Sequence, residues 1–222
     1  MRDTKHLLFP GDFPAIKRHQ LKTLQINLGY KCNQSCTHCH VNAGPTRTEM
    51  MQSDMLDLVV QYLSKQHIKL LDLTGGAPEL HPRFRKLVKS ACELNVSVRD
   101  RCNLTILLEP EQEGLAEFLA QHQVEIVASL PCYTEENVNK QRGKGVFSSS
   151  VEALQKLNAL GYGTNENLKL QLVYNPSGPV LPPSQAKLEK DYKQRLPQQT
   201  VRLHHFAYSR MKQPCLSYPG LD

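Results

Sequence analysis

The chain has 222 residues, of which 40% are hydrophobic, and a formal net charge of +6. This length is enough for one domain with a sizeable core. The sequence has no apolar run long enough to cross a membrane, and its polar N-terminal segment lacks the apolar stretch of a secretory signal peptide. Seven cysteines cannot all pair, so free thiols and a cytoplasmic location are expected.

The excess positive charge gathers late in the chain, between residues 187 and 212. No aromatic residues interleave with these basic residues in a nucleic-acid motif, so a solvated face is a better interpretation than a DNA or RNA track. An anionic small ligand would fit the basic balance equally well. Neither a nucleic acid nor a membrane is therefore expected as a partner.

Residues 1–22 are polar, are broken by proline and glycine, and are expected to form an irregular lead-in. Leu24, Ile26 and Leu28 then alternate with polar residues, which predicts a first strand that ends at Gly29. Further strands are expected over 69–73, over 96–98 with 103–108 (one strand or a broken one), over 125–130, over 168–174 and over 201–206.

Helices are expected between these strands. The spacing of Thr46 and Glu49 is that of a capping box, which predicts the start of the first helix. The apolar stripe that follows has helical spacing and is interpreted as core packing; it consists of Met51, Met55, Leu58, Val59 and Leu63. Further helices are expected after Pro82, after Pro110, over 151–160 and after Pro183. This alternation of strands and helices predicts a parallel sheet that curls into part of a barrel.

One short segment carries three cysteines. Residues 31–40 read KCNQSCTHCH, in which Cys32, Cys36 and Cys39 have the spacing C-x3-C-x2-C. Three thiolates on one loop can ligate three irons of a [4Fe–4S] cluster and leave the fourth iron open for a substrate. Zinc is the first alternative, with His38 or His40 as a nitrogen ligand, but a second cysteine hook is missing. A disulfide within so short a segment would be strained, so iron–sulfur is favoured over zinc and zinc over a disulfide.

This loop, placed directly after a first strand, resembles the signature of the radical SAM superfamily. Successive blocks also look like those of the arsenosugar-biosynthesis radical SAM proteins, or radical SAM/Cys-rich domain proteins. The blocks are TLQINLGYKCNQSCTHCHVNAGP, LDLTGGAPEL, RCNLTILLEP, ASLPCY, QRGKG and LVYNPSGP. The resemblance covers residues 23–196 and implies an α/β core domain, a partial (β/α)6 TIM-like barrel that is either complete or lacks its last strand. Residues 197–222 diverge from the family, whose members continue into a Cys-rich region, so the chain is interpreted as C-terminally truncated.

The resemblance also implies the cofactors and the chemistry. A [4Fe–4S] cluster, reduced by a flavodoxin or ferredoxin, would cleave S-adenosylmethionine (SAM) to methionine and a 5′-deoxyadenosyl radical. In arsenosugar biosynthesis the adenosyl group is expected to join a trivalent methylated arsenical. Two alternatives remain open: another radical SAM modification, of a peptide or small molecule, and an inactive fragment that binds a metal or a partner.

The active site of a parallel barrel lies at the carboxyl ends of its strands. Gly75 and Gly76 follow the second strand, and their lack of a Cβ permits a close backbone approach. The resemblance implies that this turn contacts the amino group of the SAM methionine; a plain tight turn is the alternative. Ala77 stands where the family usually has Glu, and Glu79 comes two positions later.

Four polar side chains at the same edge are candidate SAM contacts. The resemblance places Arg142 near the SAM carboxylate, which a planar guanidinium suits; an exposed arginine in a basic loop is the alternative. Asn103, Ser129 and Asn175 could each hydrogen-bond ribose or adenine, or equally cap a strand end.

Two further thiols, Cys102 and Cys132, lie near the ends of the third and fourth strands. Trivalent arsenic is soft and prefers thiolate ligands. One or both thiols are therefore hypothesised to hold the arsenical, with Cys132 as the candidate catalytic residue. The alternative is a buried thiol that acts as a small apolar side chain, which is favoured for Cys102 more than for Cys132.

Overall fold

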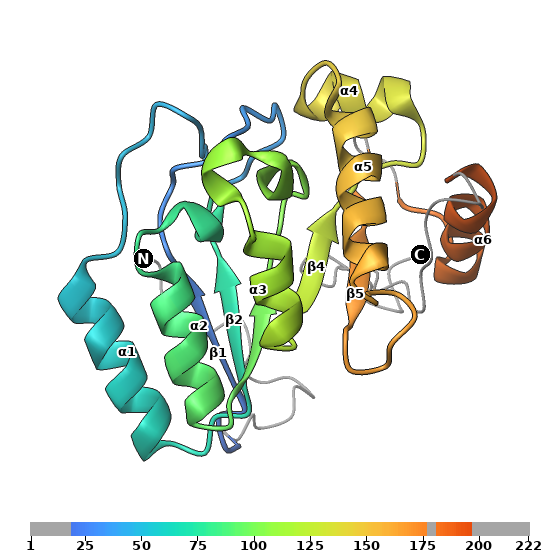
Figure 1. Cartoon of the computed structure of the whole chain (residues 1–222). Coiled ribbons are helices and arrows are strands. Elements are labelled where there is room, and N and C mark those ends of the chain that lie inside the picture. Colours follow the sequence, from blue (N-terminus) through green and yellow to red (C-terminus); the bar gives the residue numbers. More distant parts are fainter. Residues whose placement is uncertain (1–18, 177–180, 197–222) are drawn as a thin grey trace, which may run out of the picture.

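The computed structural model describes residues 19–176 and 181–196. Five strands form one sheet in the order β1-β2-β3-β4-β5, and each neighbouring pair is parallel (Figure 1). The strands are β1 Thr23–Asn27, β2 Leu70–Thr74, β3 Ser97–Asp100, β4 Glu125–Ser129 and β5 Leu170–Val173. Sequential parallel strands joined by helices form an open part of a TIM-like barrel, so the predicted fold class is confirmed. The sixth strand expected over 201–206 lies outside the described residues.

The helices that connect the strands cover one face of the sheet (Figure 1). They are α1 Ser53–Lys65, α2 Phe84–Glu93, α3 Leu115–Gln121 and, between β4 and β5, α4 Glu135–Arg142 and α5 Val146–Ala159; α6 Gln185–Arg195 follows β5. Apolar strand residues such as Leu71, Leu73 and Ile126 are fully buried in the core. Across residues 19–176 and 181–196, no helix is long and apolar enough to span a membrane.

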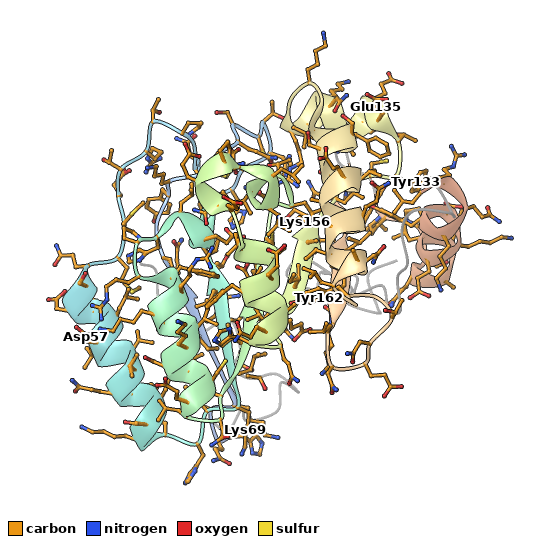
Figure 2. The ribbon with its side chains drawn as sticks, viewed as in Figure 1. Asp57, Lys69, Tyr133, Glu135, Lys156 and Tyr162 are labelled. Atoms are coloured by element: carbon orange, nitrogen blue, oxygen red, sulfur yellow. The ribbon has the colours of Figure 1, made fainter. Side chains whose placement is uncertain are left out.

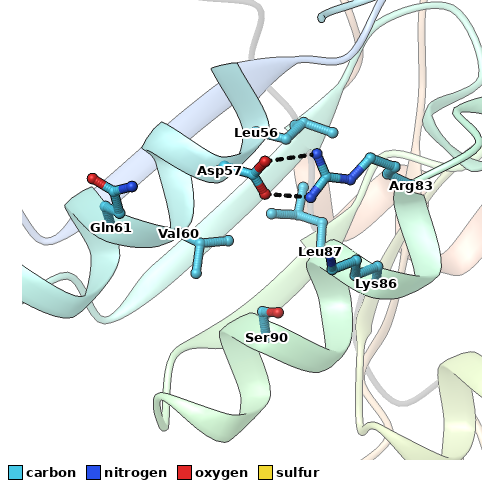
Figure 3. Close-up of a pocket in the computed structure, with 8 residues that line it drawn as sticks. All are labelled: Leu56, Asp57, Val60, Gln61, Arg83, Lys86, Leu87 and Ser90. Carbon is cyan, nitrogen blue, oxygen red and sulfur yellow. Dashed lines mark hydrogen bonds and ion pairs between the residues drawn. The ribbon is translucent and has the colours of Figure 1, made fainter. Parts of the chain in front are cut away.

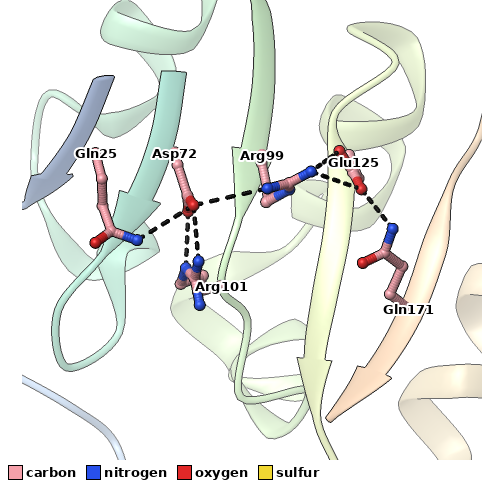
Figure 4. A network of polar contacts seen from close by, with 6 residues as sticks. All are labelled: Gln25, Asp72, Arg99, Arg101, Glu125 and Gln171. Atoms are coloured by element: carbon pink, nitrogen blue, oxygen red, sulfur yellow. Dashed lines mark hydrogen bonds and ion pairs between the residues drawn. The ribbon is translucent and has the colours of Figure 1, made fainter. Parts of the chain in front are cut away.

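The opposite face of the sheet is polar. Gln25, Asp72, Arg99 and Glu125 pair in register across four strands, so their side chains form one row (Figure 4). Arg101 donates two hydrogen bonds to Asp72, of 2.8 and 2.7 Å, and Arg99 donates one to Glu125 at 3.0 Å. The charged side chains can lie on this face because they pair with one another across the strands.

The expected strand over 103–108 is wrong. Leu104 has φ +65°, and residues Thr105–Leu108 form a 3-10 helix, η3. The Asn103 side chain accepts a hydrogen bond from the Ile106 N–H at 3.1 Å, which draws the chain into a tight turn instead of a strand. Pro110 likewise opens a 3-10 turn, η4 Pro110–Gln112, and α3 begins only at Leu115.

The prediction that a capping box at Thr46 and Glu49 starts the first helix is also wrong, because α1 begins at Ser53. The Tyr30 N–H donates to the Glu49 carbonyl and the Met51 N–H donates to the Leu28 carbonyl, so residues 49–51 are tied to the end of β1 and cannot be helical. The buried stripe of α1 is accordingly shifted. Leu56 and Leu63 are buried, whereas Met55 and Leu58 are 47% and 54% exposed.

Candidate functional site

The cysteine loop leaves the carboxyl end of β1 and lies over the same edge of the sheet (Figure 1). The Cys32 N–H donates to the Gly44 carbonyl at 3.1 Å, and the Gly44 N–H donates to the Tyr30 carbonyl at 3.0 Å, which closes the loop on itself. Cys32 is buried, Cys36 and Cys39 are half-buried, and all three are free thiols. The loop therefore presents three unpaired thiols at the edge where a parallel barrel binds its ligands.

Gly75 and Gly76 pack directly beneath this loop. A Cβ on Gly76 would lie 2.3 Å from the Lys31 carbonyl oxygen, and one on Gly75 would lie 2.6 Å from the Gly29 carbonyl oxygen. The Gly76 N–H donates to Gly29 at 2.9 Å, and the Ala77 N–H donates to Lys31 at 2.9 Å. Because these two glycines lack a Cβ, the backbone of the cysteine loop can pack directly against them.

Asn103 supports the first cysteine. Its Nδ2 donates to the Cys32 Sγ at 3.5 Å and to the Asn33 Oδ1 at 2.6 Å. Burial raises the pKa of the Cys32 thiol, while hydrogen bonds from the Gln34 backbone and from Asn103 lower it. Asn103 is a candidate for contacting ribose or adenine or for capping a strand end; here its amide hydrogen-bonds within the protein, and a contact with SAM stays a prediction. We therefore expect it to stabilise the Cys32 thiolate, the form that binds a metal.

Replacing Asn103 by alanine is expected to weaken retention of a cluster by about 10–100-fold, the range found when a hydrogen-bond partner of a metal ligand is removed. Iron retained per chain in a graded chelator challenge measures the effect. Asn137→Ala is the matched control, because its amide donates at 3.6 Å to Cys132, a thiol outside the loop. Equal iron retention by the two variants would show that the contact from Asn103 to Cys32 has no role.

Helix α4 joins the loop to the ends of β4 and β5. The Thr37 N–H donates to the Gln141 carbonyl at 3.0 Å, and the Gln141 side chain donates to the Asn175 carbonyl at 3.4 Å. Arg142 donates to the Ser129 carbonyl at the last residue of β4. Gln141 was missed by the sequence analysis, since no local pattern reveals a helix-end carbonyl that binds a loop 104 residues away.

Arg142 is only 7% exposed, which overturns the interpretation of it as a surface arginine in a basic loop. Its Nε is buried and has no partner among the described residues. Partial withdrawal from solvent and the nearby Arg142 charge both lower the pKa of His38, so this imidazole tends to the neutral form. The structure therefore places a buried guanidinium beside the cysteine loop.

The two other thiols have different surroundings. Cys102 is fully buried and its Sγ accepts the Leu104 N–H at 3.3 Å, so it has the role of a buried small side chain and cannot receive a substrate. Cys132 is 7% exposed, and its Sγ lies 3.4 Å from the Thr134 Oγ1 at the start of α4. The neighbouring Tyr133 and Glu135 lie at the carboxyl end of the sheet, opposite Lys69 at the amino end (Figure 2). Cys132 therefore lies at the carboxyl edge of the sheet, the same edge as the cysteine loop.

A surface hollow of about 280 Å³ lies elsewhere, between α1 and α2 (Figure 3). An ion pair between Asp57 and Arg83 bridges it, with one hydrogen bond of 3.1 Å. Its lining residues come from the outer helices, so it is separate from the edge that carries the cysteine loop.

The donor set of the loop fits a cluster better than a single metal ion. Thiolates on one zinc ion, each about 2.3 Å from it, would lie about 3.8 Å apart. In residues 19–176 and 181–196, the three loop thiols do not form a set in which all sulfurs lie within 4.8 Å of one another. Three free thiols spread along one loop suit the separate irons of a [4Fe–4S] cluster.

Comparisons with known proteins agree with this geometry. Residues 26–174 match the model of the family described as "Radical SAM superfamily". This chain belongs to the radical SAM superfamily. Membership implies a [4Fe–4S] cluster and SAM as cofactors.

Two curated relatives and two solved structures of one protein illustrate the similarity. The chain is 29% identical over 135 residues to "Mycofactocin maturase MftC" of Mycobacterium ulcerans (strain Agy99), covering 61% of this chain and 36% of the relative. It is 29% identical over 134 residues to "Sporulation killing factor maturation protein SkfB" of Bacillus subtilis (strain 168), covering 60% and 32%. The chain therefore spans about a third of the length of these relatives.

The solved structure is that of SuiB of Streptococcus suis, crystallised with the precursor peptide SuiA, with TM-score 0.64 and 13% identity over 85% of this chain and 39% of that chain. The same protein bound to S-adenosylmethionine matches with TM-score 0.60 and 14% identity over 85% and 50%. At this level of identity the similarity supports the fold alone, and it agrees with the partial radical SAM barrel.

Proposed function

We propose that residues 23–196 form the SAM-cleaving core of a radical SAM enzyme that modifies a peptide. The observation that carries the proposal is the loop of three free thiols, Cys32, Cys36 and Cys39, held at the carboxyl edge of the sheet. These thiolates would bind three irons and leave the fourth for SAM. When bound, the cluster supplies one electron that splits SAM into methionine and a 5′-deoxyadenosyl radical, and a flavodoxin or ferredoxin is the proposed electron donor.

The other edge residues would hold SAM. The buried Arg142 has an unpartnered Nε and suits the SAM carboxylate. The turn at Gly75 and Gly76 would offer backbone atoms to the methionine amino group. Ser129 and Asn175, at the ends of β4 and β5, would contact the nucleoside. These roles are supported by position, since parallel strands bring all four segments to one edge.

The peptide substrate is supported by the relatives, two of which are named as maturation proteins and one of which was crystallised with a precursor peptide. The inner face of the sheet is compatible with such a substrate. It carries half-exposed polar side chains, among them Arg101, rather than an apolar wall. These groups could hydrogen-bond a peptide backbone.

A trivalent methylated arsenical is the second candidate substrate. It is favoured by sequence blocks that resemble those of arsenosugar-biosynthesis proteins and by the Cys132 thiol near the end of β4. A thiolate there would suit soft arsenic. The two candidates differ in chemistry, because an arsenical would gain the adenosyl group whereas a peptide would lose a hydrogen atom.

Anaerobic reconstitution with iron, sulfide and reductant, followed by an assay for 5′-deoxyadenosine from SAM, tests the shared proposal. Protein that assembles no cluster or forms no 5′-deoxyadenosine would instead be an inactive fragment.

The substrate is tested next. Deuterated synthetic peptides should yield deuterated 5′-deoxyadenosine if a peptide is the substrate, whereas dimethylarsinite should yield an arsenic–adenosyl adduct if arsenic is. If the adduct forms, Cys132→Ser should reduce its formation while SAM cleavage persists. Unchanged turnover in that variant would remove the role of Cys132.

A further inference from the structure

Three titratable side chains that the proposed site does not use meet behind the carboxyl edge of the sheet. Glu79 belongs to η2 Pro78–Leu80, Asp100 ends β3, and Cys102 lies in the loop that follows. One carboxyl or thiol atom from each lies within 4.8 Å of the others. Glu79 is 4% exposed, and Asp100 and Cys102 are 0% exposed. The three groups are therefore sealed from water.

No cation compensates the two carboxyl groups in the described part of the chain; the groups near the Glu79 carboxyl are its own backbone N–H, the Cys102 thiol and Asp100. All four oxygens of Glu79 and Asp100 are buried without a hydrogen-bond partner in the part of the chain that the structure describes. Asp72, which is 3% exposed, differs because it accepts two hydrogen bonds from Arg101. A buried carboxylate without a donor is strongly disfavoured, so the charge of this pair must be neutralised in another way.

Among residues 19–176 and 181–196, the titratable groups that act on the pair offer no positive charge. Asp72 from β2 adds a negative charge near Asp100. Tyr162, which follows α5, lies close enough to interact with Asp100 and Cys102, but its hydroxyl donates to the Val124 carbonyl at 2.8 Å (Figure 2). Cys32 of the cysteine loop is the remaining titratable neighbour of Glu79.

We propose that Glu79 and Asp100 share one proton at neutral pH, with the Cys102 thiol protonated beside them. Two carboxyl groups that share a buried site cannot both ionise, and one proton turns two acceptors into a donor and an acceptor. Burial raises the pKa of Glu79; burial and then the Glu79 charge raise the pKa of Asp100 well above its usual range. Burial, followed by the two carboxyl groups, raises the pKa of the Cys102 thiol as well.

A metal ion would neutralise the same cluster, but the donor set is incomplete for one. Structural zinc sites have four protein ligands, whereas only three ligand atoms gather here. A proton therefore fits the cluster better, and a bound metal becomes an outcome that the experiment must be able to detect.

The shared proton ties together two segments that contact the cysteine loop. Glu79 lies three residues after Gly76, and Asp100 lies three residues before Asn103, the partner of Cys32. Loss of the proton would place two negative charges between these segments and push them apart. The inference concerns the carboxyl pair itself and holds whether or not the chain cleaves SAM.

Urea unfolding of the full chain before cluster reconstitution, between pH 5 and 8.5, tests the proposal. Above about pH 5 the unfolded chain has ionised carboxylates, while the folded chain retains one extra proton. The free energy of unfolding therefore falls as pH rises, with up to a tenfold increase in the unfolding equilibrium constant per pH unit.

Asp100→Asn and Glu79→Gln replace the shared proton by a fixed amide donor. Both variants should therefore show a smaller dependence of the unfolding free energy on pH than the parent chain. Glu125→Gln, the control, removes a carboxylate that is paired with Arg99 on the polar face of the sheet and should lower stability and keep the slope.

Infrared spectra of the parent chain provide a readout that needs no variant to fold. The C=O stretch of a protonated carboxylic acid should be present at pH 7 and should shift in D₂O. An absent band together with unchanged pH slopes in Asp100→Asn and Glu79→Gln would overturn the proposal. One equivalent of metal per chain that is present before reconstitution and absent from Cys102→Ala would overturn it too, because a metal would then neutralise the pair.

Discussion

Replacing Cys36 by alanine is expected to abolish cluster assembly and to reduce SAM cleavage below detection. Cys36 is half-buried and its thiol donates to the Gln34 Oε1 at 3.5 Å, so its removal would take away a proposed iron ligand with little effect on the core. The loss should exceed the roughly 10–100-fold cost of removing a partner of a metal ligand. Iron and sulfide content, visible absorption and 5′-deoxyadenosine formation after anaerobic reconstitution measure the effect.

Cys92→Ala is the matched control for this variant. Cys92 is a half-buried thiol on α2 that donates to the His122 carbonyl at 3.7 Å, away from the loop. It should assemble a cluster and cleave SAM as the parent chain does. A Cys36→Ala protein with a full cluster and undiminished cleavage would refute the assignment of the three thiols as iron ligands.

Replacing Gly76 by alanine is expected to destabilise the chain by about 1–3 kcal/mol or more, the usual cost of forcing an extra carbon into a packed site. The new Cβ would lie 2.3 Å from the Lys31 carbonyl oxygen and 2.8 Å from its carbonyl carbon. Both are backbone atoms and cannot rotate away, so the cysteine loop must shift. Urea midpoints and iron content after reconstitution should fall together.

Gly44→Ala tests whether this effect is specific. Gly44 lies where the loop closes, but a Cβ there would meet only the Ser35 Oγ, at 3.8 Å, an ordinary contact. Its stability should stay within about 0.5 kcal/mol of the parent chain, as is usual for substitutions that meet no strain. Similar losses in the two variants would mean that any side chain in this region is harmful, and the close approach of Lys31 would not be the cause.

Local patterns in the sequence were enough to predict the parts of this protein that depend on neighbouring residues. The spacing of Cys32, Cys36 and Cys39 can be read directly, because three ligands within eight residues need no distant partner. The alternation of strand and helix periodicity predicted the parallel sheet, because side-chain spacing reports which face of each element is buried. From these two facts it follows that the loop lies at the carboxyl edge.

The errors arose where a local pattern competed with contacts from elsewhere. Residues 103–108 have the apolar character of a strand, yet the Asn103 side chain bonds both η3 and Cys32, and the backbone turns there. Thr46 and Glu49 do not cap a helix, because hydrogen bonds hold residues 49–51 against the chain that leaves β1. In both places hydrogen bonds outweighed a weak local preference.

The sequence alone therefore determined the fold class and placed the three-cysteine loop, the predicted cluster site, at the carboxyl edge of the sheet. Only the tertiary structure decided that Arg142 is buried, that Gln141 holds the loop, and that Glu79 faces Asp100 rather than the edge. The physical reason is that burial and partnership depend on residues far apart in sequence that meet only when the sheet closes against its helices. A polar side chain reads the same in the sequence whether it meets water or a second carboxyl group, and only folding distinguishes the two.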